Sequence, residues 1–228
     1  MKINLIHLFS KIRFKKLRLW VAYPFIFLYF ALGLRTGFRL IPGILLVFAG
    51  MFVRVWASGL IKKRRKLTVS GPYSYTRNPL YLGSFLAGIG FCLFVNNILL
   101  TVAFVLVFYI LYAGTIKEEE ILLTTLFSQD YLDYKNAVPV FLPGFKRYHS
   151  TENSVYSLTQ VYINGEIIRV MACALLIWLV YTLQYFLDAG LSNIIQIQKI
   201  IIVFIFLVFG FWLSIVLRKK CLRNQGLL

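Results

Sequence analysis

Six long apolar stretches constrain the fold of this 228-residue chain more than any other feature. A helix needs about 20 apolar residues to cross the hydrocarbon core of a bilayer, and somewhat fewer when its ends lie in the interface. The third and fourth stretches are separated by little more than Asn96 and Asn97, which predicts a tight hairpin. We therefore predict an all-α fold, a polytopic membrane bundle of about six transmembrane helices, over residues 19–34, 40–60, 80–95, 98–116, 167–187 and 200–217.

The composition excludes an ordinary soluble domain, because 60% of the residues are hydrophobic, only 14% are charged and the mean hydropathy is +0.77. No internal repeat and no low-complexity linker divides the chain. We predict a single integral membrane domain over residues 1–228, with a core at about 40–145 and a C-terminal helical hairpin at about 166–218.

The net charge of +17 is distributed as in a membrane protein, not as in a protein that binds nucleic acid. Twenty of the 25 basic residues fall at one set of helix ends, where they also attract anionic lipid headgroups. This positive-inside pattern predicts that both termini are cytoplasmic, in a bacterial inner membrane or the endoplasmic reticulum. No small-residue cleavage site follows Leu34, so we expect the first stretch to be a retained span.

The sequence offers few residues for a metal site or a disulfide framework. The three cysteines lack metal-binding and disulfide spacing, and the two histidines, His7 and His149, are far apart. We therefore expect no metal site.

Three polar segments, 62–79, 117–135 and 136–165, are expected to form the cytoplasmic face. In "KEEEILLTTLFSQDYLDYK", residues 117–135, the residues Ile121, Leu122, Leu126 and Phe127 recur at helical spacing. This pattern predicts that the fourth span continues beyond the membrane as an amphipathic helix. The segment "VPVFLPGF", 138–145, contains two prolines and is expected to be irregular.

The stretch "GPYSYTRNPLYLG", residues 71–83, combines a turn with the start of a helix. Gly71 and Pro72 favour a turn, Asn78 is pushed out of the helical region by the next residue, and Pro79 suits a first helical turn. A helix N-terminus attracts carboxylates and phosphates, and Arg77 adds a charged donor. Three tyrosines, Tyr73, Tyr75 and Tyr81, offer faces for a ring or a cation. An ordinary membrane-interface belt explains these residues equally well.

Glu118, Glu119 and Glu120 form an unusual acidic group at the cytoplasmic end of the fourth span. One interpretation is pairing with Lys117 or with the "KKRRK" run at 62–66. The other is that one or two of them bind a cationic ligand or ligand hydroxyls. Neighbouring residues point about 100° apart on a helix, so Glu119 and Glu120 cannot share one task.

These blocks, read together, resemble a known family. "GPYSYTRNPLYLG", then "EEILLTTLFSQDYLDY", then "VPVFLP" is similar to the isoprenylcysteine carboxyl methyltransferases and the related phospholipid N-methyltransferases. The resemblance extends over about residues 54–143 and keeps the order and spacing of every block. It implies an integral membrane enzyme with a cytoplasmic binding face for S-adenosylmethionine.

The resemblance also implies the residues of the site. Glu119 and Glu120 match the family's Glu-Glu pair, because Leu123, Phe127 and Tyr131 then fall in register. Asn78 stands where the family has His, so a role that needs an imidazole is absent, and Ser128 stands where the family has Gly. The cofactor-binding residues implied are Tyr73, Arg77, Asn78, Pro79, Tyr81, Leu82, Gly83, Glu119 and Glu120.

Two catalytic candidates follow, Glu119 and Arg54. An amine or thiol acceptor would need a base, for which Glu119 or Glu120 is the candidate, whereas a carboxylate acceptor would need only a cation to orient it. Arg54 lies within the second span and either orients an acidic ligand or extends to the interface. Glu166 and Arg169, three residues apart at the start of the fifth span, are expected to form an ion pair.

The sequence leaves the acceptor open, since a prenylated cysteine carboxylate, a phospholipid amine or another lipid-like acceptor would fit. A second hypothesis is a membrane reductase of the sterol or isoprenoid type that uses NADPH, which the glutamate pair disfavours. A third is a non-catalytic lipid-binding membrane protein, for which the only argument is Asn78.

Overall fold

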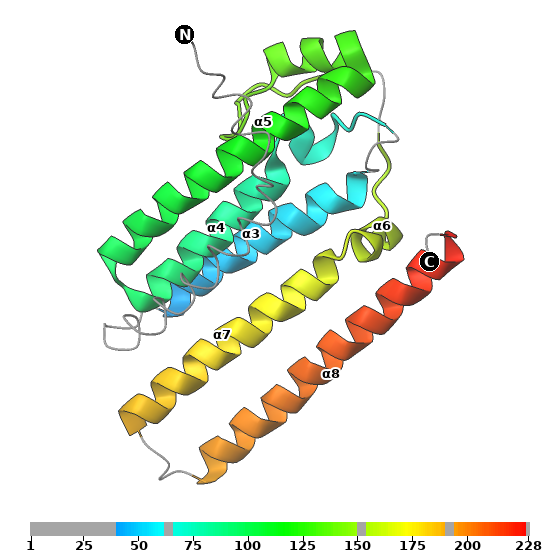
Figure 1. Ribbon diagram of the computed structural model, residues 1–228. Helices are drawn as coiled ribbons and strands as arrows, with labels where there is room; N and C mark the ends of the chain where they lie inside the picture. Colours follow the sequence, from blue (N-terminus) through cyan, green and yellow to red (C-terminus); the bar gives the residue numbers. More distant parts are fainter. Residues whose placement is uncertain (1–39, 62–65, 150–153, 190–193, 227–228) are drawn as a thin grey trace, which may run out of the picture.

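The computed structural model describes residues 40–61, 66–149, 154–189 and 194–226, and within these ranges it contains helices and no strand (Figure 1). The all-α prediction is therefore confirmed for the described part of the chain. The elements are α3 (Leu40–Leu60), the 3₁₀ turn η1 (Gly71–Ser74), α4 (Pro79–Val95), α5 (Ile98–Ala137), α6 (Leu158–Ile163), α7 (Glu166–Ala189) and α8 (Ile194–Asn224).

Four of these helices are long and apolar enough to cross a membrane: Ile41–Leu60 of α3, Ile98–Ala137 of α5, Glu166–Leu187 of α7 and Ile195–Asn224 of α8. The fifth apolar helix, α4, is shorter. Five of the six predicted spans thus appear as helices, while the first, 19–34, lies outside the described residues. The predicted hairpin between α4 and α5 is also present, with Asn96 in a left-handed conformation at the end of α4 and Asn97 accepting a hydrogen bond from Leu100 N.

Close packing of α3 on α4 forms the centre of the bundle. A Cβ atom added to Gly50 would lie 2.4 Å from the Gly83 carbonyl oxygen, and one added to Gly83 would lie 2.5 Å from the Gly50 carbonyl oxygen. Small residues at such crossings let two helix backbones approach closely in a membrane. Gly83 therefore has a packing role between the helices.

Helix α5 extends well beyond the length of a membrane span, as predicted, and bends at Ser128. The side that packs on the protein matches the predicted stripe only at Phe127. Phe127 and Leu123 pack against the cluster that contains the buried Tyr131 and Tyr134, whereas Ile121, Leu122 and Leu126 are exposed. The sequence pattern contains two apolar stripes on this helix, and tertiary contacts select the one that continues into the tyrosines.

The bend places Ser128 in a conformation that favours glycine. Ser128 has φ 44° and ψ −118°, a conformation that glycine adopts freely and that strains other residues. We expect Ser128→Gly to raise the free energy of unfolding by about 1 kcal/mol, measured by reversible unfolding in mixed micelles. The control is Thr125→Gly in the regular part of α5, which should destabilise by up to about 1 kcal/mol. A loss of stability in Ser128→Gly would contradict the assigned conformation.

The α7–α8 pair lies beside the α3–α4–α5 bundle and is tied to it near α6 (Figure 1). Asn164 Nδ2 donates to the Ser58 carbonyl at 2.9 Å, and Ser157 N donates to the Gly59 carbonyl at 3.0 Å. Farther along α7, Cys173 and Ile177 pack against the core between α3 and α4. These contacts place the first turns of α7 beside the C-terminal half of α3.

Candidate active site

A cavity of about 760 Å³ lies between α3, α4, α5 and α7 and reaches the loop before α4. It brings together most of the residues selected from the sequence: Arg54, Tyr73, Arg77, Asn78, Pro79, Tyr81, Glu119 and Glu120 all line it. Leu82 and Gly83 do not line it, because Leu82 is buried beside the helix crossing where Gly83 packs. Tyr75 does not line it either.

The loop before α4 is built by the chemistry that its sequence predicts. Gly71 has φ 60° and opens η1, and α4 begins at Pro79 with Asn78 outside the helical region at φ −126° and ψ 56°. The irregular segment 138–148 supports this loop: Arg77 N donates to the Pro139 carbonyl at 2.9 Å, and Thr76 Oγ1 donates to the Phe141 carbonyl at 2.8 Å. The proline-containing segment 138–148 thus fixes the loop before α4 through these hydrogen bonds.

Asn78 belongs to this support. Its Nδ2 donates to the Val140 carbonyl at 2.9 Å, so an uncharged N–H donor is what the position requires in this structure. A neutral histidine can supply such a donor, which accounts for the family's His being replaceable by Asn here.

This role predicts the outcome of two substitutions at position 78. Asn78→His should retain cofactor affinity within about threefold, whereas Asn78→Asp turns a carboxylate toward the Val140 carbonyl and should cost about 1 kcal/mol of stability. Thermal unfolding in detergent and calorimetric binding measure both effects. If Asn78→Asp is as stable as Asn78→His, the hydrogen bond to the Val140 carbonyl does not contribute to stability.

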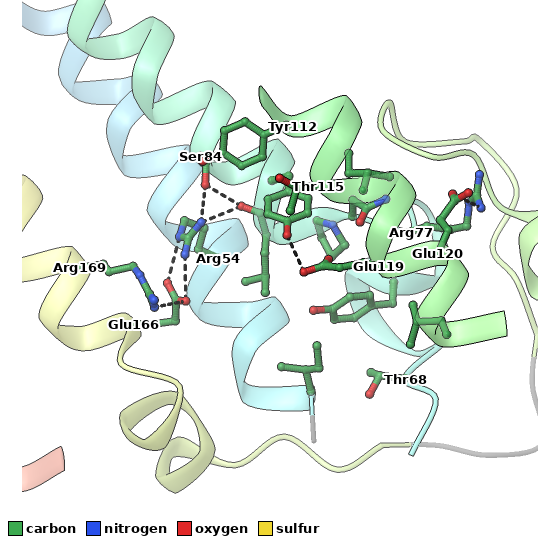
Figure 2. Close-up of a pocket in the computed structure, with 18 of the residues that line it drawn as sticks. Arg54, Thr68, Arg77, Ser84, Tyr112, Thr115, Glu119, Glu120, Glu166 and Arg169 are labelled. Carbon is green, nitrogen blue, oxygen red and sulfur yellow. Dashed lines mark hydrogen bonds and ion pairs between the residues drawn. The ribbon is translucent and has the colours of Figure 1, made fainter. Parts of the chain in front are cut away.

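The two glutamates differ in their partners, as neighbouring positions on a helix require (Figure 2). Glu120 lies beside Arg77, with an Nη1–Oε1 distance of 2.6 Å, and also pairs with Lys135 at 3.0 Å. Glu119 points to the other side and accepts a hydrogen bond from the Tyr81 hydroxyl at 2.8 Å. Two cations therefore pair with Glu120, whereas Glu119 has no cation partner among the described residues. Glu118 is exposed and does not line the cavity.

Two buried donors in the cavity wall have no hydrogen-bond partner in the described part of the chain: the Tyr73 hydroxyl and Arg77 Nε. Burial, with the nearby carboxylates Glu166 and Glu119, raises the pKa of Tyr73 far above its ordinary value, so the phenol stays protonated. A buried polar group without a partner is costly and marks a site where a ligand is expected to supply one. Both groups donate, so the matching ligand atom is an acceptor such as a carboxylate oxygen.

Aromatic rings form a further part of the wall. Tyr81 and Tyr112 meet edge to face with ring centroids 4.9 Å apart, and Tyr112 stacks on Phe108 at 4.0 Å. Both tyrosines line the cavity. Such rings offer π faces to a sulfonium or an adenine ring.

Arg54 lies on the opposite side of the cavity from Arg77 and is held by a carboxylate that the sequence did not assign to it (Figure 2). Its Nε and Nη2 donate to Glu166 at 3.0 and 2.9 Å, and its Nη1 donates to the Leu80 carbonyl at 2.8 Å and to Ser84 Oγ. Glu166 also pairs with Arg169 at 2.7 Å, which confirms the ion pair expected from the sequence. Arg54 is thus a fixed part of the wall, with its donors largely committed.

The sequence predicts only the pairing of Glu166 with Arg169, whereas in the structure Glu166 also binds Arg54 and lines the cavity. A signal was available: an arginine inside one span needs a counter-charge, and Glu166 is an acid at the end of another apolar stretch. The two residues are separated by 112 positions, so only the tertiary structure joins them.

Comparison with known proteins identifies the segment that forms this site. Residues 38–130 match the family model described as "Phospholipid methyltransferase". The chain is 34% identical over 126 residues to "Protein-S-isoprenylcysteine O-methyltransferase" of Saccharomyces cerevisiae, covering 50% of this chain and 53% of that protein. It is 39% identical over 80 residues to the Xenopus laevis protein of the same name, covering 35% of this chain and 28% of that protein.

A bacterial relative has a different name: "Nickel-cobalt-cadmium resistance protein NccN" of Alcaligenes xylosoxydans xylosoxydans is 31% identical over 99 residues, 42% of this chain and 46% of that protein. No solved structure matches the chain significantly. The chain thus spans about half or less of the length of these curated relatives. Residues 38–130 of this chain are thus similar to the phospholipid methyltransferases, and parts of the chain are similar to the isoprenylcysteine O-methyltransferases.

Proposed function

We propose that this protein transfers a methyl group from S-adenosylmethionine to a membrane-embedded or lipid-like acceptor. One observation carries the proposal: a single cavity holds the Glu119 carboxylate, which accepts a hydrogen bond from the Tyr81 hydroxyl, and two buried donors, Tyr73 Oη and Arg77 Nε, that lack partners among the described residues. All four residues lie in the segment that matches the methyltransferase family.

The donor set fits the functional groups of this cofactor. Its carboxylate would complete the buried donors of Tyr73 and Arg77, near the N-terminus of α4. Its ammonium or ribose hydroxyls would meet the Glu119 carboxylate, and its adenine or sulfonium would lie against Tyr81 and Tyr112. When bound, the cofactor supplies an electrophilic methyl group on a positively charged sulfur.

The protein's own contribution is positioning and charge placement. The ion pair of Arg77 with Glu120 fixes the donor side of the cavity. Glu119 holds the cationic side. For a carboxylate acceptor no base is needed, whereas for an amine Glu119 would be the residue that takes the proton.

The membrane supplies the acceptor in this account. The cavity wall includes the apolar residues Met51, Phe91 and Leu176 of three helices that lie among the apolar spans. Two relatives are named for prenylated cysteine, so a prenylated carboxyl acceptor is the first to test, with the reaction at the cytoplasmic ends of the helices. We also propose that both termini are cytoplasmic, because most basic residues lie at the helix ends on that side.

Calorimetric titration of the detergent-purified protein tests the cofactor assignment. We expect S-adenosylmethionine and S-adenosylhomocysteine to bind with micromolar dissociation constants, and NADPH not to bind. The variant Arg77→Ala should abolish the binding of both sulfur compounds, while Arg147→Ala, an exposed arginine outside the cavity, should not. Binding of NADPH alone would replace this proposal with a reductase.

A further inference from the structure

We propose that Arg169, held by Glu166 and Arg54, makes the acceptor side of the cavity selective for an anionic acceptor, a carboxylate at the end of an apolar body. The inference rests on the proposed methyl transfer and concerns the choice that the family leaves open, carboxylate or amine. It depends on residues of α7 that lie outside the segment matching the family model.

The cluster of Arg54, Glu166 and Arg169 carries one excess positive charge. The Glu166 side chain is 3% exposed and the Arg54 side chain 11%, so water screens this ion pair poorly, whereas the Arg169 side chain is 50% exposed and is partly in contact with solvent. The Glu166 carboxylate receives both arginines, with Oε1 bonded to Arg54 Nη2 and to Arg169 Nη1. A single carboxylate cannot neutralise two guanidinium groups, and an anionic ligand would complete the balance.

Arg169 is the member of the cluster with donors still to offer. Arg54 uses its Nε, Nη1 and Nη2 on Glu166, Leu80 and Ser84. Arg169 is half exposed and bonds through Nη1 alone, to the Asn164 carbonyl at 2.9 Å and to Glu166 at 2.7 Å, in the part of the chain described. Its Nε–Nη2 edge is a planar pair of donors, which suits two carboxylate oxygens.

The side chains around the cluster suit the apolar body of such an acceptor. Met51, Ala87, Phe91, Ala172 and Leu176 line the same cavity, from α3, α4 and α7. An apolar body can lie along these side chains while its charged end remains beside Arg169. A protonated amine on the same body would meet the excess positive charge and lose affinity.

The chemistry also favours the anion. A carboxylate oxygen attacks the methyl carbon, the C–O bond forms, and the S–C bond breaks with its electron pair going to sulfur. The negative charge of the carboxylate and the positive charge of the sulfonium cancel, and no proton is released. Attack by an amine instead creates an ammonium beside a cationic cluster and leaves a proton to be removed.

The test compares two amphiphiles that share one tail, S-farnesyl thiopropionate and S-farnesyl cysteamine, with hexadecanoate as a carboxylate on a straight tail. Equilibrium binding of the radiolabelled amphiphiles is measured on protein loaded with S-adenosylhomocysteine in phosphatidylcholine nanodiscs, whose neutral surface does not favour either charge. Wild type should bind the thiopropionate at least about tenfold more tightly than the cysteamine. If hexadecanoate binds as tightly as the thiopropionate, the acceptor carboxylate belongs to a lipid acid. If hexadecanoate binds more weakly, the acceptor is an isoprenyl thioether.

Arg169→Gln should lower thiopropionate affinity about tenfold, leave cysteamine binding equal or improved, and leave the affinity for S-adenosylhomocysteine unchanged. Arg169→Lys should restore part of the preference. The control Arg218→Gln removes the same charge from α8, where Arg218 Nε donates to the Ile163 carbonyl outside the cavity, and should change nothing.

Two results would overturn the inference: equal binding of carboxylate and amine by wild type, or a preference that Arg169→Gln leaves intact. Failure of the proposed function is separable, because it would appear as loss of S-adenosylhomocysteine binding in wild type. Intact cofactor binding with indifference to acceptor charge would refute only the role of Arg169.

Discussion

Glu119→Gln should lower the affinity for S-adenosylmethionine by about 30-fold or more and reduce methyl transfer to background. The substitution keeps the size of the side chain and its contact with the Tyr81 hydroxyl, yet it removes a cavity carboxylate that, unlike Glu120 and Glu166, pairs with no cation in the described part of the chain. Loss of a charged partner in a buried site costs about 2 kcal/mol or more, which corresponds to that change in affinity. Isothermal titration of the purified variant measures it.

Glu118→Gln is the matched control, because it makes the same chemical change one residue away on the exposed side of α5. It should bind as wild type does. Glu120→Gln should have an intermediate effect, since it acts through Arg77, which loses its partner at 2.6 Å. Equal losses in the three variants would indicate a general effect of acidic charge and would contradict the distinct role of Glu119.

Glu166→Gln should be the most destabilising conservative substitution in the chain, at about 3 kcal/mol of unfolding free energy. Glu166 is buried and binds two arginines from different helices, so its loss leaves both guanidinium groups uncompensated and loosens α7 from α3. Reversible unfolding in mixed micelles measures the change. Asp133→Asn, an exposed acid on α5, should lie within about 0.5 kcal/mol of wild type.

The double variant Arg54→Met with Glu166→Leu separates charge from packing. Removing both partners avoids an isolated buried charge, so the protein should regain stability to within about 1 kcal/mol of wild type, with its acceptor binding lost. If the double variant is less stable than Glu166→Gln, the cluster contributes to stability directly, and its assignment to ligand selection weakens.

Features with local causes could be predicted from the sequence. Pro79 after Asn78 determines where α4 begins, Asn96 and Asn97 turn the chain between α4 and α5, and the prolines of 138–145 keep that segment irregular. The family resemblance added the choice of Glu119 and Glu120 over Glu118. These residues act through their own backbone or the next helical turn, so nearby sequence contains the information.

Features with distant causes could not be predicted. Arg54 is occupied by Glu166, which lies 112 residues away, and Glu120 is neutralised by Arg77 and Lys135, which come from different segments. Leu82 was predicted as a site residue because the family resemblance includes its motif, yet it is buried outside the cavity. The sequence contains each charge but not the pairing, and the pairing determines which groups remain for a ligand.

Transfer of tritium from methyl-labelled S-adenosylmethionine tests the central claim most directly. Purified wild type or Glu119→Gln in nanodiscs would be incubated with the labelled cofactor and S-farnesyl thiopropionate or S-farnesyl cysteamine, and the organic phase would be counted, with empty nanodiscs as the blank. We predict time-dependent label in the organic phase for wild type and none above background for the variant. Wild type that binds the cofactor but transfers no label to either acceptor, or a Glu119→Gln variant as active as wild type, would contradict the account.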